Sequence, residues 1–199
     1  MLETQDLLLK KAVFEDWEDL YARVWRHWET ARYMFWRVTE SEEEAQDRMR
    51  RTLAYQASHE HVYTVYDRRS GRAIGFAGMR ELEPGIWEET GVALGPDYVG
   101  RGYGGQILDA LTRTAFARGG RLFRAFCREQ NERSRRLILS RGFRPTGSEQ
   151  CLDERTGETY TLLHFALTAP AAAPGSEPGP DTERSDAGDP RPGRPDPVG

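Results

Sequence analysis

Residues 92–108 read Val-Ala-Leu-Gly-Pro-Asp-Tyr-Val-Gly-Arg-Gly-Tyr-Gly-Gly-Gln-Ile-Leu, and this stretch decides how the rest of the chain is interpreted. Four glycines fall within positions 100–105, between a β-rich run and a helical pattern. Glycine lets consecutive backbone N–H groups face one point, and a helix N-terminus carries roughly half a positive charge. The loop therefore predicts a phosphate cradle. A tight turn that needs glycine for packing alone is the alternative.

The segments on both sides of this loop alternate between strand and helix patterns. We expect strands at 7–9, 61–66, 73–79, 86–94, 122–127, 143–152 and 158–167. A helix capped by Asp16 should bury Trp17, Leu20, Tyr21, Val24 and Trp28, and the capping box Ser41–Glu44 should open a helix with Ala45, Met49 and Leu53 inside. The helix after the loop should bury Ile107, Leu108, Leu111 and Ala115, and a short helix spans 131–141. This order predicts one mixed α/β (α+β) domain.

Composition sets the boundaries of that domain. The chain has 199 residues and a net charge of −4, and eight of its 11 prolines lie beyond residue 168. Residues 2–168 are therefore the expected folded domain, and 169–199 are expected to form a disordered tail. The chain has no surplus of basic residues that would point to a nucleic-acid partner. It also has no segment with the pattern of a transmembrane helix or a signal peptide. Cys127 and Cys151 give neither a disulfide framework nor a zinc spacing, which favours a metal-free cytoplasmic protein with buried, inert thiols.

One alternative for the loop is dinucleotide binding. Gly100, Gly102 and Gly105 satisfy the G-x-G-x-x-G pattern, and Glu129 lies near the place of a ribose-binding acid. That fold places its loop after the first strand and repeats βα units afterwards. Here a long helical and antiparallel part precedes the loop, so an oxidoreductase is a remote alternative.

The run 96–105 resembles the acetyl-CoA loop of the GNAT superfamily of N-acetyltransferases. Gly102 and Gly104 match its Gln/Arg-x-x-Gly-x-Gly/Ala pattern, whereas Val99 stands at the Gln/Arg place. Four further segments also resemble family motifs and occur in the family's order. Two precede the loop, namely the opening strand with residues 15–17 and the strand 73–78, and two come after it, namely Asn131 to Ser134 and residues 141–143. The likeness spans about residues 2–168 and is strongest to the branch that acetylates ribosomal proteins.

This resemblance implies a twisted mixed sheet, splayed between its fourth and fifth strands (86–94 and 122–127), with helices on both faces. Acetyl-CoA would lie in the splay as co-substrate. Its pantetheine would pair with backbone at Val92, Ala93 and Leu94, and its pyrophosphate would take the loop Val99, Gly100, Arg101, Gly102, Tyr103, Gly104 and Gly105. Asn131 and Ser134 would flank the thiol. The Val92 N–H would stabilise the developing oxyanion.

The resemblance also implies direct attack by a primary amine in a ternary complex, which calls for a base. Glu88 and Glu89 are adjacent on one strand and should point to opposite faces, Glu88 with Thr90, Val92 and Leu94, and Glu89 with Gly91 and Ala93. Two family patterns disagree on the base, and the whole-chain likeness favours Glu89. Water chains are a third possibility.

The sequence lacks the residue that serves as general acid in many relatives. Many relatives carry a tyrosine where Ile138 stands, so Ser134 is the candidate donor to the thiolate, or else only a helix cap. A non-catalytic acyl-CoA-binding module on the same fold is therefore an alternative to the enzyme.

The acceptor is not determined by the sequence. Met34, Phe35 and Trp36 belong to an aromatic-rich stretch that is either core or the acceptor pocket. The remaining partner is a small-molecule or protein amine, and the chain is expected to be a monomer or a homodimer.

Overall fold

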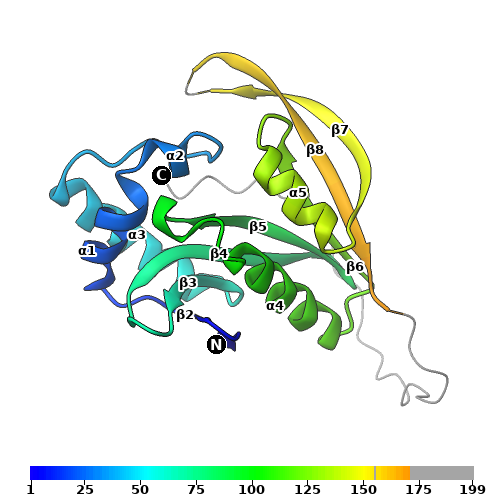
Figure 1. The fold of residues 1–199 in the computed structure, drawn as a ribbon, viewed down its shortest axis with the longest axis horizontal. Coiled ribbons are helices and arrows are strands. Elements are labelled where there is room, and N and C mark those ends of the chain that lie inside the picture. The colour runs from blue at the N-terminus through cyan, green and yellow to red at the C-terminus, as the bar shows by residue number, and fades with distance from the viewer. Residues whose placement is uncertain (155, 171–199) are drawn as a thin grey trace, which may run out of the picture.

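The computed structural model describes residues 1–154 and 156–170, so the predicted tail lies, beyond Pro170, outside the described residues. An eight-stranded sheet in the order β1-β2-β3-β4-β5-β6-β8-β7 forms its centre (Figure 1). The strands are β1 (Leu2–Glu3), β2 (Leu7–Lys10), β3 (Val62–Asp67), β4 (Ala73–Glu83), β5 (Ile86–Leu94), β6 (Leu122–Arg128), β7 (Arg144–Asp153) and β8 (Glu158–Thr168). All the strands predicted from the sequence are present, and only the two-residue β1 was missed.

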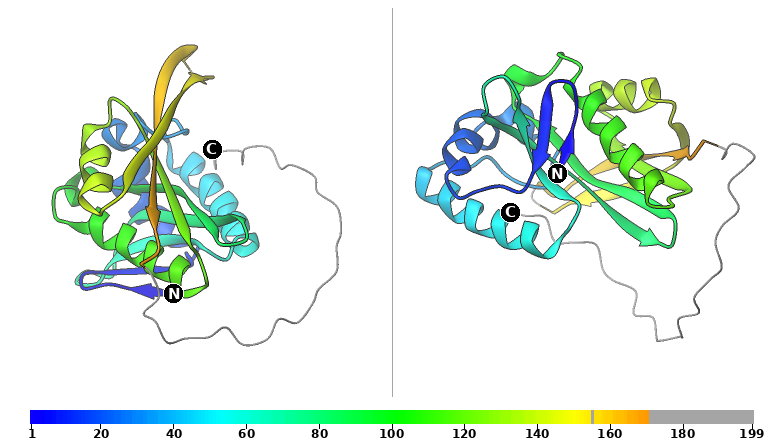
Figure 2. Two further views of the ribbon diagram at one scale, coloured as in Figure 1. Left: turned by 90° about the vertical axis from the view of Figure 1, so that its right-hand side faces the viewer. Right: turned by 90° about the horizontal axis from the view of Figure 1, so that it is seen from below.

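The helices are α1 (Asp16–Leu20), the π-helix η1 (Tyr21–Trp25), α2 (Trp28–Ala31), α3 (Glu42–Ser58), the 3-10 helix η2 (Pro96–Tyr98), α4 (Tyr103–Ala117) and α5 (Glu132–Ser140). They cover both faces of the sheet, α1 to α3 on one and α4 with α5 on the other (Figure 2). Each face has its own core because strand side chains alternate. In β2, Leu7 and Leu9 join the core under α4, and Leu8 packs against the core under α3.

The region predicted as a single first helix is different in the structure. The chain forms α1, then five residues of π-helix, and it turns at His27, whose φ and ψ are −99° and 118°. The wider turn of a π-helix shifts every later residue around the axis. Trp25 is therefore buried and Trp28 is 63% exposed, so the prediction that Trp28 faces inward was wrong. Asp16 does not cap the helix, since its carboxylate accepts the Val13 N–H instead.

The predicted N-cap of α3 is confirmed, but the return bond of the capping box goes to the residue before the cap. The Ser41 hydroxyl accepts the Glu44 N–H at 3.2 Å, while the Glu44 carboxylate accepts the N–H of Glu40. Ala45 and Met49 are buried as predicted, which anchors α3 against its face of the sheet.

The splay of the sheet lies between β5 and β6. These strands pair in parallel only from Ile86 with Leu122 to Glu88 with Arg124. Beyond that point β6 continues to pair with β8 as far as Arg128, and β5 continues with β4 as far as Leu94. The predicted splay is confirmed. It is also the only parallel pair among the described strands, so the dinucleotide-binding fold was a wrong alternative.

A β-bulge in β5 changes which side chains share a face. Gly78 pairs with Gly91, yet Met79 pairs with Glu89, so Thr90 is the extra residue. Side-chain alternation therefore reverses at Thr90. Glu89 lies on the same face as Val92 and Leu94, toward α4, and not with Gly91 and Ala93 as predicted from strict alternation.

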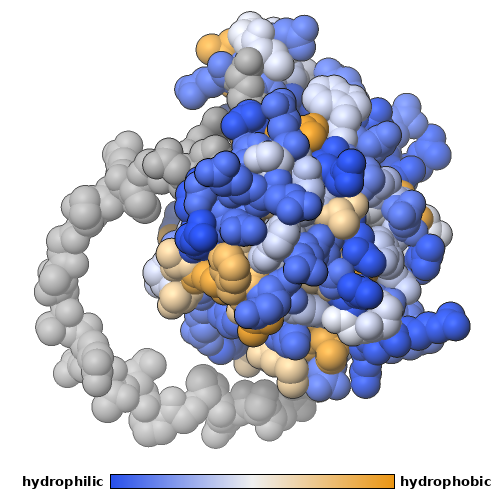
Figure 3. All heavy atoms as spheres, turned by 90° about the vertical axis from the view of Figure 1, so that its left-hand side faces the viewer, coloured by the Kyte–Doolittle hydropathy of each residue, from blue (hydrophilic) through white to orange (hydrophobic). Residues whose placement is uncertain are grey.

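The outer surface of the α1–α3 side is mostly hydrophilic, with small separate hydrophobic areas (Figure 3). Within the described residues, no helix combines the length and the apolar character that crossing a membrane requires. At the opposite end of the sheet, β7 and β8 form a long hairpin that extends past α5 (Figure 1).

Candidate active site

Glu89 is the acidic side chain at the splay. It is buried, at 8% exposure, one residue beyond the last β5–β6 pair. Burial raises its pKa to about 8, against the lowering effect of the Phe126 N–H, which donates to the carboxylate; the nearby Glu88 raises it further. Desolvation outweighs the hydrogen bond because one neutral donor cannot replace the hydration of a carboxylate. Glu89 can therefore exchange a proton near neutral pH.

Glu88 has a different environment. Its carboxylate lies 3.0 Å from the Arg80 guanidinium on β4, and both side chains are partly exposed. Of the two glutamates left open by the sequence, Glu89 is the one with the environment of a base.

The Cys127 thiol of β6 lies near Glu89, and Ser134 of α5 lies near that thiol. The thiol of Cys127 hydrogen-bonds with Ser134, and burial raises its pKa to about 11, with Glu89 contributing in the same direction. The Cys127 thiol is therefore protonated. Asn131 is the N-cap of α5, and its side chain accepts the Ser134 backbone N–H at 3.2 Å. The cap is thus Asn131, and the Ser134 side chain interacts with the Cys127 thiol and lowers its pKa, against the larger effect of burial.

The glycine loop places two of its glycines in left-handed conformation. Gly100 and Gly102 both have φ of +80°, and a Cβ added at either would meet no atom within 4 Å. Backbone geometry and not packing therefore requires glycine here, and the space above both residues is open. Gly102 is the N-cap of α4 with no side-chain cap, so the first N–H groups of that helix have no capping side chain.

Gly104 and Gly105 lie in the first turn of α4, directly after the loop. A Cβ at Gly104 would come within 2.8 Å of Leu137 on α5, and one at Gly105 within 2.3 Å of the Arg141 side chain. The alternative that glycine is needed for packing thus applies to these two residues, which let α4 and α5 approach.

The aromatic-rich stretch after α2 divides between core and site. Trp36 is buried and packs on the Arg48 guanidinium, 4.1 Å from its ring centre, so it belongs to the core. Met34 instead lies over β5, 3.6 Å from a Cβ built on Gly91, and Phe35 is 44% exposed. Met34 therefore reaches the strand that carries Glu89.

Three site features were missed by the sequence reasoning. Tyr33 donates from its hydroxyl to the Gln130 carbonyl at 3.1 Å, which links the segment after α2 to the loop before α5. The second feature is Cys127, which was predicted to be a buried, inert thiol. The third is the N–H of Phe126, which as a backbone group has no sequence signature. No sequence pattern marks any of them, because each depends on two distant segments meeting at the splay.

The chain matches the family model of the acetyltransferase (GNAT) domain over residues 6–144. It therefore belongs to the GNAT acetyltransferase family, as the sequence resemblance implied. No curated protein is significantly similar to it in sequence.

Solved structures of this family have the same fold. A GNAT-family acetyltransferase from Bacillus anthracis has a TM-score of 0.72 and 19% identity, with 84% of this chain and 97% of that chain covered. The microcin C7 self-immunity acetyltransferase MccE, in complex with acetyl-CoA and AMP, has a TM-score of 0.70 and 15% identity, with 83% and 94% covered. The ribosomal L7/L12 alpha-N-protein acetyltransferase RimL, in complex with coenzyme A through a cysteine disulfide, has a TM-score of 0.65 and 20% identity, with 83% and 95% covered.

Proposed function

We propose that the protein is an acetyl-CoA-dependent N-acetyltransferase that transfers the acetyl group to a primary amine by direct attack in a ternary complex. The observation that carries this proposal is the buried Glu89 carboxyl, with a pKa of about 8, at the point where β5 and β6 separate. A proton acceptor in that place suits an amine that enters the splay.

The residues around the splay fit acetyl-CoA. Among the described residues, the edge of β5 that faces β6 has no pairing strand beyond Glu88, so backbone groups near Val92 and Ala93 are available to pantetheine amides, whereas the Leu94 carbonyl accepts the Thr30 hydroxyl at 3.4 Å. The open space above Gly100 and Gly102 suits a pyrophosphate, which the first N–H groups of α4 would bind. Asn131 and Ser134 would border the thioester end.

Glu89 would remove the proton of the attacking amine. A lysine-type ammonium of pKa about 10.4 costs roughly 4.6 kcal/mol to deprotonate at pH 7, and an α-ammonium of pKa about 7.7 costs about 1 kcal/mol. A carboxylate with a pKa near 8 holds that proton far better than an ordinary glutamate. The backbone N–H of Val92 would donate to the oxyanion, worth roughly 2.7–4 kcal/mol by comparison with other oxyanion holes.

Ser134 would donate to the thiolate that leaves. The tyrosine that many relatives carry as the general acid is absent here, because a buried isoleucine, Ile138, stands in its place. The Ser134 hydroxyl hydrogen-bonds with the Cys127 thiol, which is itself protonated. The Ser134 hydroxyl would donate a hydrogen bond to the leaving sulfur and stabilise the thiolate until water protonates it.

The decisive experiment is a screen of amines with detection of the released CoA thiol. The full chain is offered acetyl-CoA with peptide α-amines, lysine peptides, polyamines, amino acids and aminoglycosides. Thiol release with one acceptor class, abolished in Glu89→Gln, supports the enzyme. Tight acetyl-CoA binding without turnover of any amine would favour the acyl-CoA-binding module, and absence of binding would contradict both.

A further inference from the structure

The first turn of α4 is rich in glycine. Gly102 is the N-cap of this helix, and Gly104 and Gly105 lie within its first turn. Glycine has a low helix propensity, because ordering its backbone costs more conformational entropy than ordering that of other residues. A helix end of this composition therefore depends on tertiary contacts to keep its helical form. It is also the turn whose N–H groups would bind the pyrophosphate of acetyl-CoA.

Gln106 follows these glycines, and its side chain is held by the turn between β1 and β2. Its amide oxygen accepts the Thr4 hydroxyl at 2.7 Å and the Asp6 backbone N–H at 3.0 Å. Its amide nitrogen donates to the Asp6 carboxylate at 2.6 Å. These hydrogen bonds join the first turn of α4 to a turn that lies 100 residues earlier in the chain.

The turn that holds Gln106 is itself fixed to the sheet. The Thr4 hydroxyl also accepts the Leu7 N–H at 2.9 Å. Leu7 is fully buried in the core between the sheet and α4. The contact with Gln106 therefore connects the glycine turn to a rigid part of the fold.

Other contacts hold the later turns of α4. Ile107 and Leu111 are fully buried against the sheet. Asp109 pairs with Arg141 at the end of α5, at 3.2 Å, but this ion pair is exposed and contributes little. The polar contact made by the first turn itself is thus the one through Gln106.

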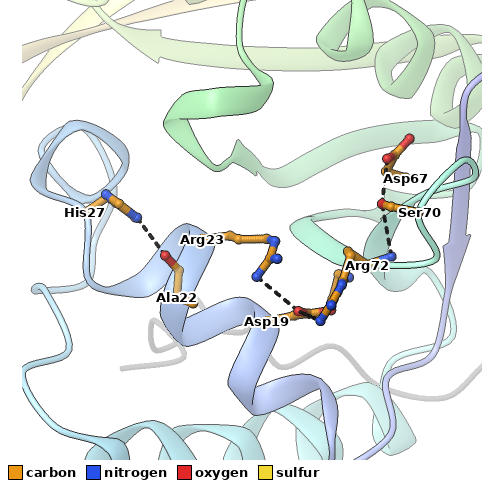
Figure 4. Close-up of polar contacts among 8 residues, drawn as sticks. Asp19, Ala22, Arg23, His27, Asp67, Ser70 and Arg72 are labelled. Atoms are coloured by element: carbon orange, nitrogen blue, oxygen red, sulfur yellow. Dashed lines mark hydrogen bonds and ion pairs between the residues drawn. The ribbon is translucent and has the colours of Figure 1, made fainter.

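The polar side chains of α1, η1 and the β3–β4 turn lie beside the glycine loop but contact one another (Figure 4). Asp19 lies 3.1 Å from Arg23 and 3.0 Å from Arg72. The Ser70 hydroxyl donates to Asp67 at 2.6 Å. These contacts join α1 and η1 to the β3–β4 turn, and they do not hold the first turn of α4.

We propose that Gln106 is a positioning residue for the co-substrate. Its hydrogen bonds to Thr4 and Asp6 keep the glycine turn helical, so that the N–H groups after Gly102 already point to one place when the pyrophosphate arrives. Donors that are ordered in advance bind more tightly than donors that binding must order. The inference rests on the proposed function, because acetyl-CoA is the ligand that the turn would bind.

Gln106→Leu tests the proposal in the full chain, because leucine replaces the amide with apolar groups and adds no charge. Gln56→Leu on α3 is the matched control, since the Gln56 amide likewise accepts a backbone N–H, from Ala12, and donates to the hydroxyl of Thr64. By calorimetry, acetyl-CoA affinity should fall about fivefold or more in Gln106→Leu and less than about twofold in Gln56→Leu. In amine turnover, KM for acetyl-CoA should rise by the same factor while kcat stays within about twofold. Unchanged affinity in Gln106→Leu overturns the proposal.

Amide hydrogen exchange reports on the turn without any ligand. The Gly105 N–H bonds to the Gly102 carbonyl at 3.1 Å, and it should exchange about fivefold faster or more in Gln106→Leu. The Leu111 N–H, deeper in α4, should change less than about twofold. Unchanged exchange at Gly105, or an equal increase at Leu111, overturns the proposal. Absence of acetyl-CoA binding by the unaltered protein would contradict the proposed function, whereas faster exchange at Gly105 would still support the ordering of the turn by Gln106.

A double variant exchanges the donor and the acceptor of the contact. Gln106→Glu alone brings two carboxylates together and should weaken acetyl-CoA binding about fivefold or more. Combined with Asp6→Asn, the carboxylate at position 106 accepts the Thr4 hydroxyl, the backbone N–H of residue 6 and the new side-chain amide, so affinity should return to within about threefold of the unaltered protein. A double variant as weak as Gln106→Leu would overturn the proposal.

Discussion

The carboxyl group of Glu89 on β5 interacts with the backbone N–H of Phe126 on β6, just beyond the last residues that the two strands pair. This N–H lowers the pKa of the carboxyl group, while burial raises it more strongly, to about 8. The Glu89 carboxyl group, which titrates near neutral pH, therefore lies where β5 and β6 separate.

The first prediction concerns the base. Glu89→Gln keeps the shape of the side chain but cannot accept a proton, so kcat should fall by roughly 10²–10⁴ with acetyl-CoA affinity retained. The rise of activity with pH through about 8 should disappear. Glu88→Gln is the matched control and should change kcat less than threefold, because Glu88 is paired with Arg80. Loss of activity in Glu88→Gln alone would reverse the assignment.

The stability of the protein should depend on pH through Glu89. Its pKa is about 8 when folded and near 4.5 when unfolded, so its contribution is fully present below about 4.5 and is lost as the pH rises through 8. The melting temperature should therefore decline between about pH 5 and 8 and level off above that, and Glu89→Gln should reduce this decline by a few degrees. Differential scanning fluorimetry measures it. A variant with the unaltered slope would show that another group titrates.

The glycine loop offers a pair of substitutions with separate outcomes. Gly102→Asp puts a side chain and a negative charge into the open space, at a φ of +80°, so acetyl-CoA binding should weaken at least tenfold. Gly104→Ala instead presses on Leu137, so its main effect should be a melting temperature lowered by a few degrees. Calorimetry and thermal melts distinguish the two. Unchanged affinity in Gly102→Asp would contradict the pyrophosphate assignment.

Ser134 should act on the leaving group. Ser134→Ala removes the hydroxyl but keeps the backbone N–H that Asn131 accepts, so the helix cap survives. We expect kcat to fall about tenfold or more at saturating amine. Ser140→Ala on the same helix, whose hydroxyl bonds only to the Leu137 carbonyl, serves as control. Equal kinetics for the two variants would mean that the Ser134 hydroxyl has no chemical role.

The composition of residues 169–199 predicts that they contribute nothing to the core. Truncation after Pro170 should leave the melting temperature and the acetyl-CoA affinity within error of the full chain. A loss of several degrees would place part of this segment against the folded domain.

Much of the fold follows from local pattern. The strand from Ile86 to Leu94 and the capping box of α3 have the predicted places, because apolar alternation and capping chemistry act over a few neighbouring residues. The prediction of one continuous first helix was wrong because local pattern does not include tertiary contacts. The spacing of its apolar residues suits a continuous α-helix. In the structure a π-helix places Trp25 on the Arg48 guanidinium, which also packs on Trp36, and leaves Trp28 exposed. Local spacing does not contain this tertiary contact.

The sequence by itself determined the family, the glycine loop and the two candidate glutamates, since these are statements about residue types in order. Tertiary structure decided what those residues can do. The bulge at Thr90 sets the face of Glu89, and burial at the splay raises its pKa to about 8. Segments distant in the sequence bring Phe126, Cys127 and Ser134 around it. Desolvation and hydrogen bonding depend on what surrounds a group in space, and local sequence does not encode those surroundings.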